Sequence, residues 1–241
     1  MTVVEVRGLR KMFGQVTAVQ DLSFDVRPGS VTGFLGPNGA GKTTTLRMLL
    51  GLVRSDAGTA TIGGKAYGEL AGPMRHVGAV LEASSFHPGR TARQHLRIQA
   101  LASGADLGRV AEVLELVQLS GAEDRRAGQF SLGMRQRLGL ATALLADPDV
   151  LILDEPTNGL DPEGVRWMSA LLRGYAAEGG TVLVSSHLLA EVEQTVDAVV
   201  IIDHGRLVAQ ASLAELTAEY RGLEAAFLRL TSINARREAT R

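Results

Sequence analysis

A glycine-rich loop, residues 36–43 (GPNGAGKT), matches the complete pattern G-x-x-x-x-G-K-[ST]. Its glycines let backbone N–H groups turn inward around phosphate oxygens, in conformations that a Cβ atom would resist. A helix that begins near Gly41 would direct its N-terminal N–H groups at the same anion. Lys42 would bring a positive charge to the β- and γ-phosphates, and Thr43 would offer a hydroxyl to Mg²⁺. The loop therefore predicts a site for nucleotide phosphates.

Two adjacent carboxylates, Asp154 and Glu155, follow the apolar run of residues 150–153. A carboxylate at the carboxyl edge of a parallel sheet faces the crevice in which ligands bind. We expect Asp154 to hold the metal through its water shell and Glu155 to polarise an attacking water. Alone, the pair would fit a solvated acidic turn equally well, but beside the glycine-rich loop the catalytic interpretation is favoured.

Apolar runs of strand length must position these groups. We expect strands at residues 3–9, 22–26, 31–35, 59–62, 77–81, 150–153, 181–184 and 199–202. Several are continuous in Val, Ile and Leu, which is typical of strands buried on both faces. Helical patterns at residues 41–52 and 163–177 alternate with them. Strand, turn, helix and strand in this order predict an α/β architecture.

One stretch breaks the alternation, because no strong strand pattern occurs between about Thr91 and Ala146. Val110, Val113, Leu114 and Val117 fall on one helical face, and residues 138–145 form a second apolar helical run. About 50 residues are therefore expected to form an all-helical insert in the α/β core. The tail from Ser212 is also helical in pattern.

Composition excludes several classes of protein. The 241 residues are 45% hydrophobic with a net charge of −1, which argues against global disorder and against a nucleic-acid coat protein. The sequence has no cysteine, so it has no disulfide framework, thiolate zinc site or cysteine nucleophile. We expect neither a secretory signal nor a membrane span, because there is no apolar h-region and no run of about 18 apolar residues.

Further motifs follow in a fixed order. Residues 130–137 (FSLGMRQR) resemble the ABC signature motif, residues 158–162 (NGLDP) resemble the D-loop, and residues 185–187 (SSH) resemble the switch histidine. With the glycine-rich loop and the acidic pair, they make residues 2–222 resemble the ATP-binding subunit of an ABC transporter. The resemblance implies a P-loop NTPase (ABC-type ATPase) core with a mixed sheet, an N-terminal antiparallel β subdomain and an inserted all-α subdomain. It places the ATPase domain at residues 1–222, the insert at about 91–146 and a helical tail at 223–241.

The resemblance also implies the roles of single residues. Glu155, His187 and Lys42 would be catalytic, with His187 bridging the γ-phosphate, Glu155 and the partner's D-loop. Thr43, Asp154 and Glu82 would hold Mg²⁺. The expected ATP-binding residues are Phe13 and Ala18 at the adenine, Asn38, Gly39, Ala40, Gly41, Lys42, Thr43 and Thr44 at the phosphates, and Ser131, Gly133, Met134 and Asp161 at the subunit contact. Two alternatives stay open: Ser131 as an ordinary helix N-cap, and Phe13 as a core residue.

This sequence departs from the family pattern at two motifs. Glu82 stands where the family usually carries a glutamine, since Gln94 lies too far into the helical insert. In the signature, Leu132 replaces a glycine and Met134 a glutamine. The departures resemble the branch that exports lantibiotics, bacitracin and related drugs, although they would also fit a weak or regulatory ATPase.

The expected function is therefore an ATPase that powers solute export through a separate membrane permease. Two copies, expected to be identical, would hold two MgATP between the glycine-rich loop of one and the signature of the other. We expect the permease to dock on the helical insert and on residues 82–90, which places the chain in the cytoplasm on the inner face of the cell membrane, with no nucleic-acid partner. The alternatives are a soluble ABC-type ATPase in cofactor assembly and a non-hydrolysing nucleotide switch.

Overall fold

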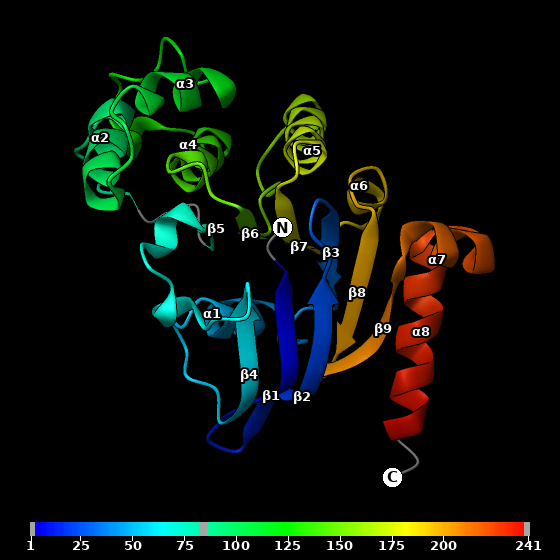
Figure 1. Ribbon diagram of the computed structural model, residues 1–241. Coiled ribbons are helices and arrows are strands. Elements are labelled where there is room, and N and C mark those ends of the chain that lie inside the picture. The colour runs from blue at the N-terminus through cyan, green and yellow to red at the C-terminus, as the bar shows by residue number, and fades with distance from the viewer. Residues whose placement is uncertain (1–2, 82–85, 239–241) are drawn as a thin grey trace.

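The computed structural model describes the backbone of residues 3–81 and 86–238 and the side chains of residues 3–81 and 86–232. Its core is a six-stranded sheet of order β5-β6-β7-β3-β8-β9. The strands are β5 (Val77–Val80), β6 (Val150–Asp154), β7 (Thr181–Ser186), β3 (Val31–Leu35), β8 (Ala198–Asp203) and β9 (Arg206–Ser212). The first five run parallel and β9 is antiparallel to β8. This mixed sheet confirms the predicted α/β class (Figure 1).

A second sheet, of order β2-β1-β4, is antiparallel. It consists of β1 (Val4–Phe13), β2 (Val16–Val26) and β4 (Ala57–Ile62). Strands β1 and β2 form a hairpin whose last pair is Phe13 opposite Val16. The prediction ended the first strand at residue 9 and began the second at residue 22. The hairpin tip escaped prediction because its side chains are mostly exposed and show no apolar run.

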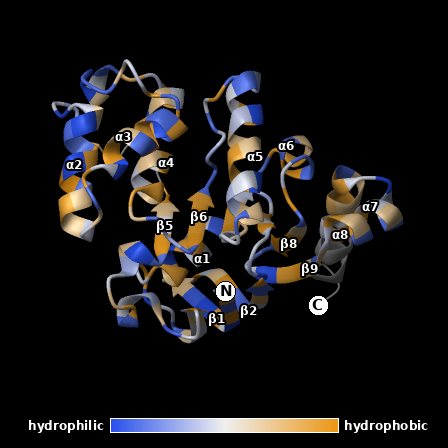
Figure 2. Cartoon of the chain, turned by 45° about the horizontal axis from the view of Figure 1, so that its top comes forward, coloured by the Kyte–Doolittle hydropathy of each residue, from blue (hydrophilic) through white to orange (hydrophobic). Residues whose placement is uncertain are grey.

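The six-stranded sheet is buried on both faces, because alternate residues of a strand point to opposite sides. On β6, Val150 and Ile152 pack in a core shared with the antiparallel sheet. Leu151 and Leu153 pack in a second core beneath the helices. Burying such a side chain contributes about 1.5–3 kcal/mol. The hydrophobic strands lie at the centre of the molecule in Figure 2.

The helices of the nucleotide core follow strands that end near the site. Helix α1 (Lys42–Leu49) follows β3, α5 (Pro162–Ala177) follows β6, and α6 (Leu189–Glu193) follows β7. At the C-terminal end, α7 (Leu213–Tyr220) and α8 (Leu223–Glu238) pack beside β9. Strand β9 was not predicted, because its residues are only partly buried.

The segment between β5 and β6 is helical. It contains α2 (Ala92–Ser103), α3 (Arg109–Leu116), the 3₁₀ turn η3 (Ala127–Gln129) and α4 (Leu132–Leu144), drawn in green in Figure 1. Two further 3₁₀ turns, η1 (Tyr67–Glu69) and η2 (Pro73–Arg75), lie between β4 and β5. The division into an ATPase domain, an insert and a tail stays a prediction. Across residues 3–81 and 86–238, no helix is both long and apolar enough to span a membrane.

Candidate functional site

Three neighbouring strands end at one edge of the sheet and bring the predicted motifs together. Strand β7 lies between β3 and β6, and its Ser185 pairs with Phe34 on one side and Asp154 on the other. Because these strands are parallel, the residues that follow each of them emerge at the same edge. The glycine-rich loop, the acidic pair and His187 therefore meet, although about 145 residues separate the first from the last.

The glycine-rich loop turns tightly between β3 and α1. Gly41 has φ +100°, and a Cβ atom there would lie 2.4 Å from the carbonyl oxygen of Ala18. Any other residue at this position would collide with the backbone of β2. Gly41 is also the N-cap of α1 and provides no side-chain cap, so the first-turn N–H groups of that helix remain available to an anion.

The Lys42 side chain folds back into the loop. Its Nζ donates hydrogen bonds to the carbonyl oxygens of Gly36 at 2.6 Å and Pro37 at 3.3 Å. Burial lowers the pKa of Lys42, and the nearby charges of Glu155 and Asp154 oppose that shift. A buried ammonium group beside open backbone N–H groups is suited to bind the oxygens of a phosphate.

Asp154 accepts hydrogen bonds at both of its carboxylate oxygens. The hydroxyl of Thr43 donates to Oδ2 at 2.7 Å, and the hydroxyl of Ser185 donates to Oδ1 at 2.5 Å. Carboxylate and hydroxyl oxygens suit Mg²⁺, which retains several water or phosphate ligands. Thr43 and Asp154 thus present a hydroxyl and a carboxylate oxygen side by side, a donor set that fits Mg²⁺.

Glu155 and His187 form the second pair of the site. His187 Nδ1 lies 2.7 Å from Glu155 Oε2, and a carboxylate can only accept, so this contact assigns the ring proton to Nδ1. The N–H of Glu155 donates to the hydroxyl of Ser185 at 3.0 Å. Glu155 has φ +52°, an uncommon backbone conformation for a residue with a side chain. Its side chain is 21% exposed, so water can reach the carboxylate.

The signature motif opens α4 beside the turn that follows Glu155. Ser131 is the N-cap, and its hydroxyl accepts a hydrogen bond from the N–H of Met134 at 3.2 Å. A Cβ atom at Gly133 would lie 3.2 Å from the carbonyl oxygen of Gly159. Ser131 is therefore an ordinary helix N-cap in this structure, as one of the two interpretations predicted. Within the described part of this chain, no hydrogen bond joins the N-terminus of α4 to the glycine-rich loop.

This geometry coincides with a family match. Residues 19–158 match the family model described as ABC transporter. The chain belongs to the ABC transporter family. It is an ATP-binding subunit of that family and an ATPase, and such subunits work with a transmembrane permease. The predicted family membership is confirmed.

Two curated relatives and one solved structure are similar to this ABC subunit. The bacitracin transport ATP-binding protein of Bacillus licheniformis is 45% identical over 209 residues, which are 86% of this chain and 68% of that protein. The Nod factor export ATP-binding protein I of Burkholderia orbicola is 41% identical over 87% of this chain and 70% of that protein. A structure of the ATP-binding subunit of an ABC transporter superposes with a TM-score of 0.86 at 28% identity, covering 95% of this chain and 99% of that one.

The two residues predicted to face the adenine lie on the β1–β2 hairpin. Phe13 is 51% exposed near its tip, with Lys11 Nζ 5.4 Å from the ring centroid, so Phe13 is not a core residue. Ala18 is half-buried, and its carbonyl oxygen contacts the glycine-rich loop at Gly41. The contact of both residues with adenine stays a prediction.

The remaining predicted residues are placed as follows. Asn38 and Gly39 are exposed, Ala40 is buried and Thr44 is half-buried in the loop and first turn of α1. Asp161 caps α5, where its Oδ1 accepts from the N–H of Gly164 at 2.8 Å. Glu82 lies outside the described residues, so its predicted role at the metal stays a prediction.

Two polar residues of the ABC motifs received no role in the prediction. Ser185 holds both members of the acidic pair, through Asp154 Oδ1 and the N–H of Glu155. Gln136 is buried in α4, where its Nε2 donates to the carbonyl oxygens of Glu155 at 3.4 Å and Asn158 at 3.3 Å. Their positions inside the matched motifs were the available signal, but spacing alone does not say which backbone group a side chain reaches.

Proposed function

We propose that this subunit hydrolyses MgATP at the glycine-rich loop and thereby drives solute export through a separate permease. One observation carries the proposal. The Thr43–Asp154 pair and the Glu155–His187 pair, each at 2.7 Å, converge at the edge of the sheet where Lys42 and the loop also lie. Phosphoryl transfer requires groups that bind the phosphates, oxygen ligands for a metal ion and a carboxylate that water can reach, and these residues provide all three.

Each residue has a task that follows from its position. The loop N–H groups and Lys42 bind and orient the phosphates, which supplies positioning and charge stabilisation. Thr43 and Asp154 would hold Mg²⁺, which would supply positive charge against the phosphate oxygens. Glu155 orients the attacking water and accepts its proton at the carboxylate. His187 donates from Nδ1–H to that carboxylate and thereby holds it in place.

A second copy completes the site in this proposal. Ser131, Gly133 and Met134 form the N-terminus of a thirteen-residue helix, which favours an anion, and Ser131 is exposed. The same first turn packs on residues 159 and 160, next to Asp161. In a homodimer, the N-terminus of α4 would contact the γ-phosphate held by the partner, and Asp161 would line the subunit contact.

The names of the relatives support the direction of transport. One is a bacitracin transport protein and another a Nod factor export protein. From these similarities we propose that this subunit also drives export and that the solute is a drug or an antibiotic peptide. The permease would hold the subunit at the cytoplasmic face of the cell membrane.

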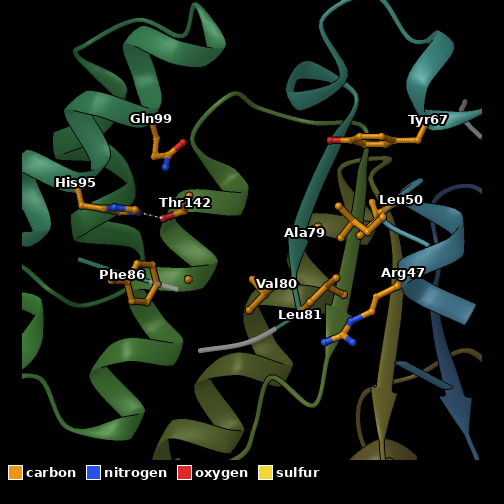
Figure 3. Close-up of a pocket in the computed structure, with 12 residues that line it drawn as sticks. Arg47, Leu50, Tyr67, Ala79, Val80, Leu81, Phe86, His95, Gln99 and Thr142 are labelled. Carbon is orange, nitrogen blue, oxygen red and sulfur yellow. Dashed lines mark hydrogen bonds between the residues drawn. The ribbon is translucent and has the colours of Figure 1, made fainter. Parts of the chain in front are cut away.

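A cavity of about 450 Å³ offers the docking site for that permease. One wall comes from α1 and the segment after it, with Arg47, Leu50 and Leu52. The other comes from the helical insert, with His95 and Thr142 (Figure 3). Leu52 is 66% exposed at this cavity. We propose that a short helix of the permease lies here, with an apolar face against the leucines.

Hydrolysis is tested by two pairs of variants. Lys42→Ala is expected to weaken ATP binding at least about a hundredfold, because it removes a charge-assisted contact in the loop. Lys65→Ala changes an exposed lysine and should leave binding unaltered. Glu155→Gln should lower kcat by about a hundredfold or more with ATP affinity retained. Glu163→Gln, in the first turn of α5, should leave kcat unchanged.

The second copy is tested with the same Glu155→Gln variant. If two copies enclose ATP, this variant should elute as a dimer with MgATP and as a monomer without it. A variant that stays monomeric and still hydrolyses ATP would contradict the roles given to both Glu155 and the N-terminus of α4.

Docking of the permease is tested by introducing a negative charge into the cavity. Leu52→Glu should abolish association with the co-expressed permease and leave basal ATP hydrolysis unchanged. Leu228→Glu, at a comparably exposed leucine on α8, is the matched control. Equal loss of association in both variants, or in neither, would refute docking at this cavity.

A further inference from the structure

The turn between β8 and β9 is hydrogen-bonded to both the glycine-rich loop and β2. The N–H of Gly205 donates to the carbonyl oxygen of Ala40 at 3.0 Å. The carbonyl oxygen of Gly205 accepts from the N–H of Gln20 at 2.7 Å. One residue late in the chain therefore connects the segment that carries Ala18, on the base side, with the phosphate side of the site.

The three backbones approach too closely for a side chain at this turn. A Cβ atom at Gly205 would lie 2.7 Å from the carbonyl oxygen of Ala18 and 2.8 Å from Cα of Val19. Both are backbone atoms, which cannot rotate aside as a flexible side chain would. Gly205 also has φ +74°, which residues with a Cβ atom rarely adopt. The carbonyl of Ala18 is thus enclosed between Gly205 on the turn and Gly41 on the loop.

The contact to Ala40 orients the next N–H group of the loop. In a trans peptide, C=O and N–H point in opposite directions. Because the carbonyl of Ala40 points at Gly205, the N–H of Gly41 points to the far side of that peptide. In the described part of the chain, the N–H of Gly41 has no acceptor of its own. It is therefore held ready for an external anion.

We propose that Gly205 is a positioning residue of the nucleotide site. It fixes the spacing between β2 and the glycine-rich loop, and it orients the Gly41 N–H toward a phosphate oxygen of ATP or of free pyrophosphate. Gly205 touches no reacting atom. This inference rests on the phosphate-binding role proposed above for the glycine-rich loop.

The variant Gly205→Ala tests the proposal against a matched control. Gly64 has φ +77° and nothing within 4 Å of a Cβ atom, so Gly64→Ala carries the same backbone strain without the collision. Gly205→Ala should raise the Kd for ATP and for pyrophosphate about tenfold, the effect of one displaced hydrogen bond to a charged ligand. It should change kcat at saturating ATP less than about twofold. Gly64→Ala should change neither quantity. Equal nucleotide affinity in the two variants would overturn the proposal.

A measurement on the wild-type chain covers the case in which Gly205→Ala does not fold. By NMR, the Gly205 amide should exchange slowly with solvent, and pyrophosphate should shift the Gly41 amide resonance. Exchange of Gly205 at the rate of an exposed turn would overturn the proposal.

Lys42→Ala, measured in parallel, separates this inference from the proposed function. If Lys42→Ala leaves ATP affinity unchanged, the phosphate role of the loop fails and the role of Gly205 fails with it. If Lys42→Ala abolishes binding while Gly205→Ala behaves like Gly64→Ala, only the role of Gly205 is refuted.

Discussion

His187 Nδ1 and Glu155 Oε2 lie 2.7 Å apart, although 32 positions separate the two residues along the chain. They reach each other because β6 and β7 are adjacent and parallel and both end just before them. Since the carboxylate takes its hydrogen bond from the imidazole, the two side chains form one unit at the water-accessible end of the site.

The unit predicts non-additive kinetics. His187→Ala should lower kcat by about a hundredfold with ATP affinity retained, because Glu155 loses the group that holds its carboxylate. The double variant with Glu155→Gln should be hardly slower than the slower single variant. His87→Ala, at an exposed histidine, serves as the control in the steady-state assay. Fully multiplicative losses in the double variant would show that the two residues act independently.

The Thr43–Asp154 contact predicts a dependence on Mg²⁺. Thr43→Val removes the hydroxyl at constant shape, so half-maximal ATP hydrolysis should require about tenfold more Mg²⁺. Thr43→Ser keeps the hydroxyl and should restore the wild-type requirement. Titration of Mg²⁺ at constant free ATP measures the effect, and identical titrations for the Val and Ser variants would exclude a metal-binding role for Thr43.

Gln136 predicts a coupled loss of stability and activity. Gln136→Met keeps the volume but removes the Nε2 donor from two half-buried carbonyl groups, of which that of Glu155 keeps the N–H of Asn158 as a donor, so the expected cost is about 1 kcal/mol. The thermal midpoint should fall by about 2–4 °C, since that is the shift that about 1 kcal/mol produces in a chain of this size. Because one of these carbonyls belongs to Glu155, kcat should fall as well.

An exposed glutamine provides the comparison for Gln136. Gln129→Met should change neither the thermal midpoint nor kcat. A Gln136→Met variant with a lowered midpoint and unchanged kcat would assign Gln136 to packing alone.

His95 predicts a pH-dependent stability. Burial, and secondarily the charge of Arg90, lowers the pKa of His95 below its ordinary value of 6.5. The unfolded chain therefore binds this proton more readily, so stability is lost as the pH falls below about 6.5 and is fully present above it. Gln at this position can still bond Thr142, which lies 3.1 Å from Nε2. When the pH is lowered from about 7.5 to below 6.5, the thermal midpoint of His95→Gln should decline less than that of the wild type. Parallel declines in the two proteins would contradict this prediction.

Contiguous motifs carried most of the site prediction. The glycine-rich loop and the acidic pair are each contiguous, so residue type and spacing were sufficient to propose them, whereas His187 was proposed from the family resemblance. The parallel core strands were equally accessible, because burial on both faces leaves a continuous apolar run.

Contacts between distant segments were decided by the tertiary structure alone. Ser185 bonds both acidic residues, and Gln136 bonds the turn after Glu155. Gly205 bonds Ala40 in the glycine-rich loop and Gln20 in the antiparallel sheet. No local pattern encodes these contacts, because each depends on which strand lies beside which and on how closely two backbones approach. The half-buried strand β9 and the tip of the β1–β2 hairpin escaped prediction for a related reason. Their ladder partners stabilise them, whereas their own apolar pattern is weak.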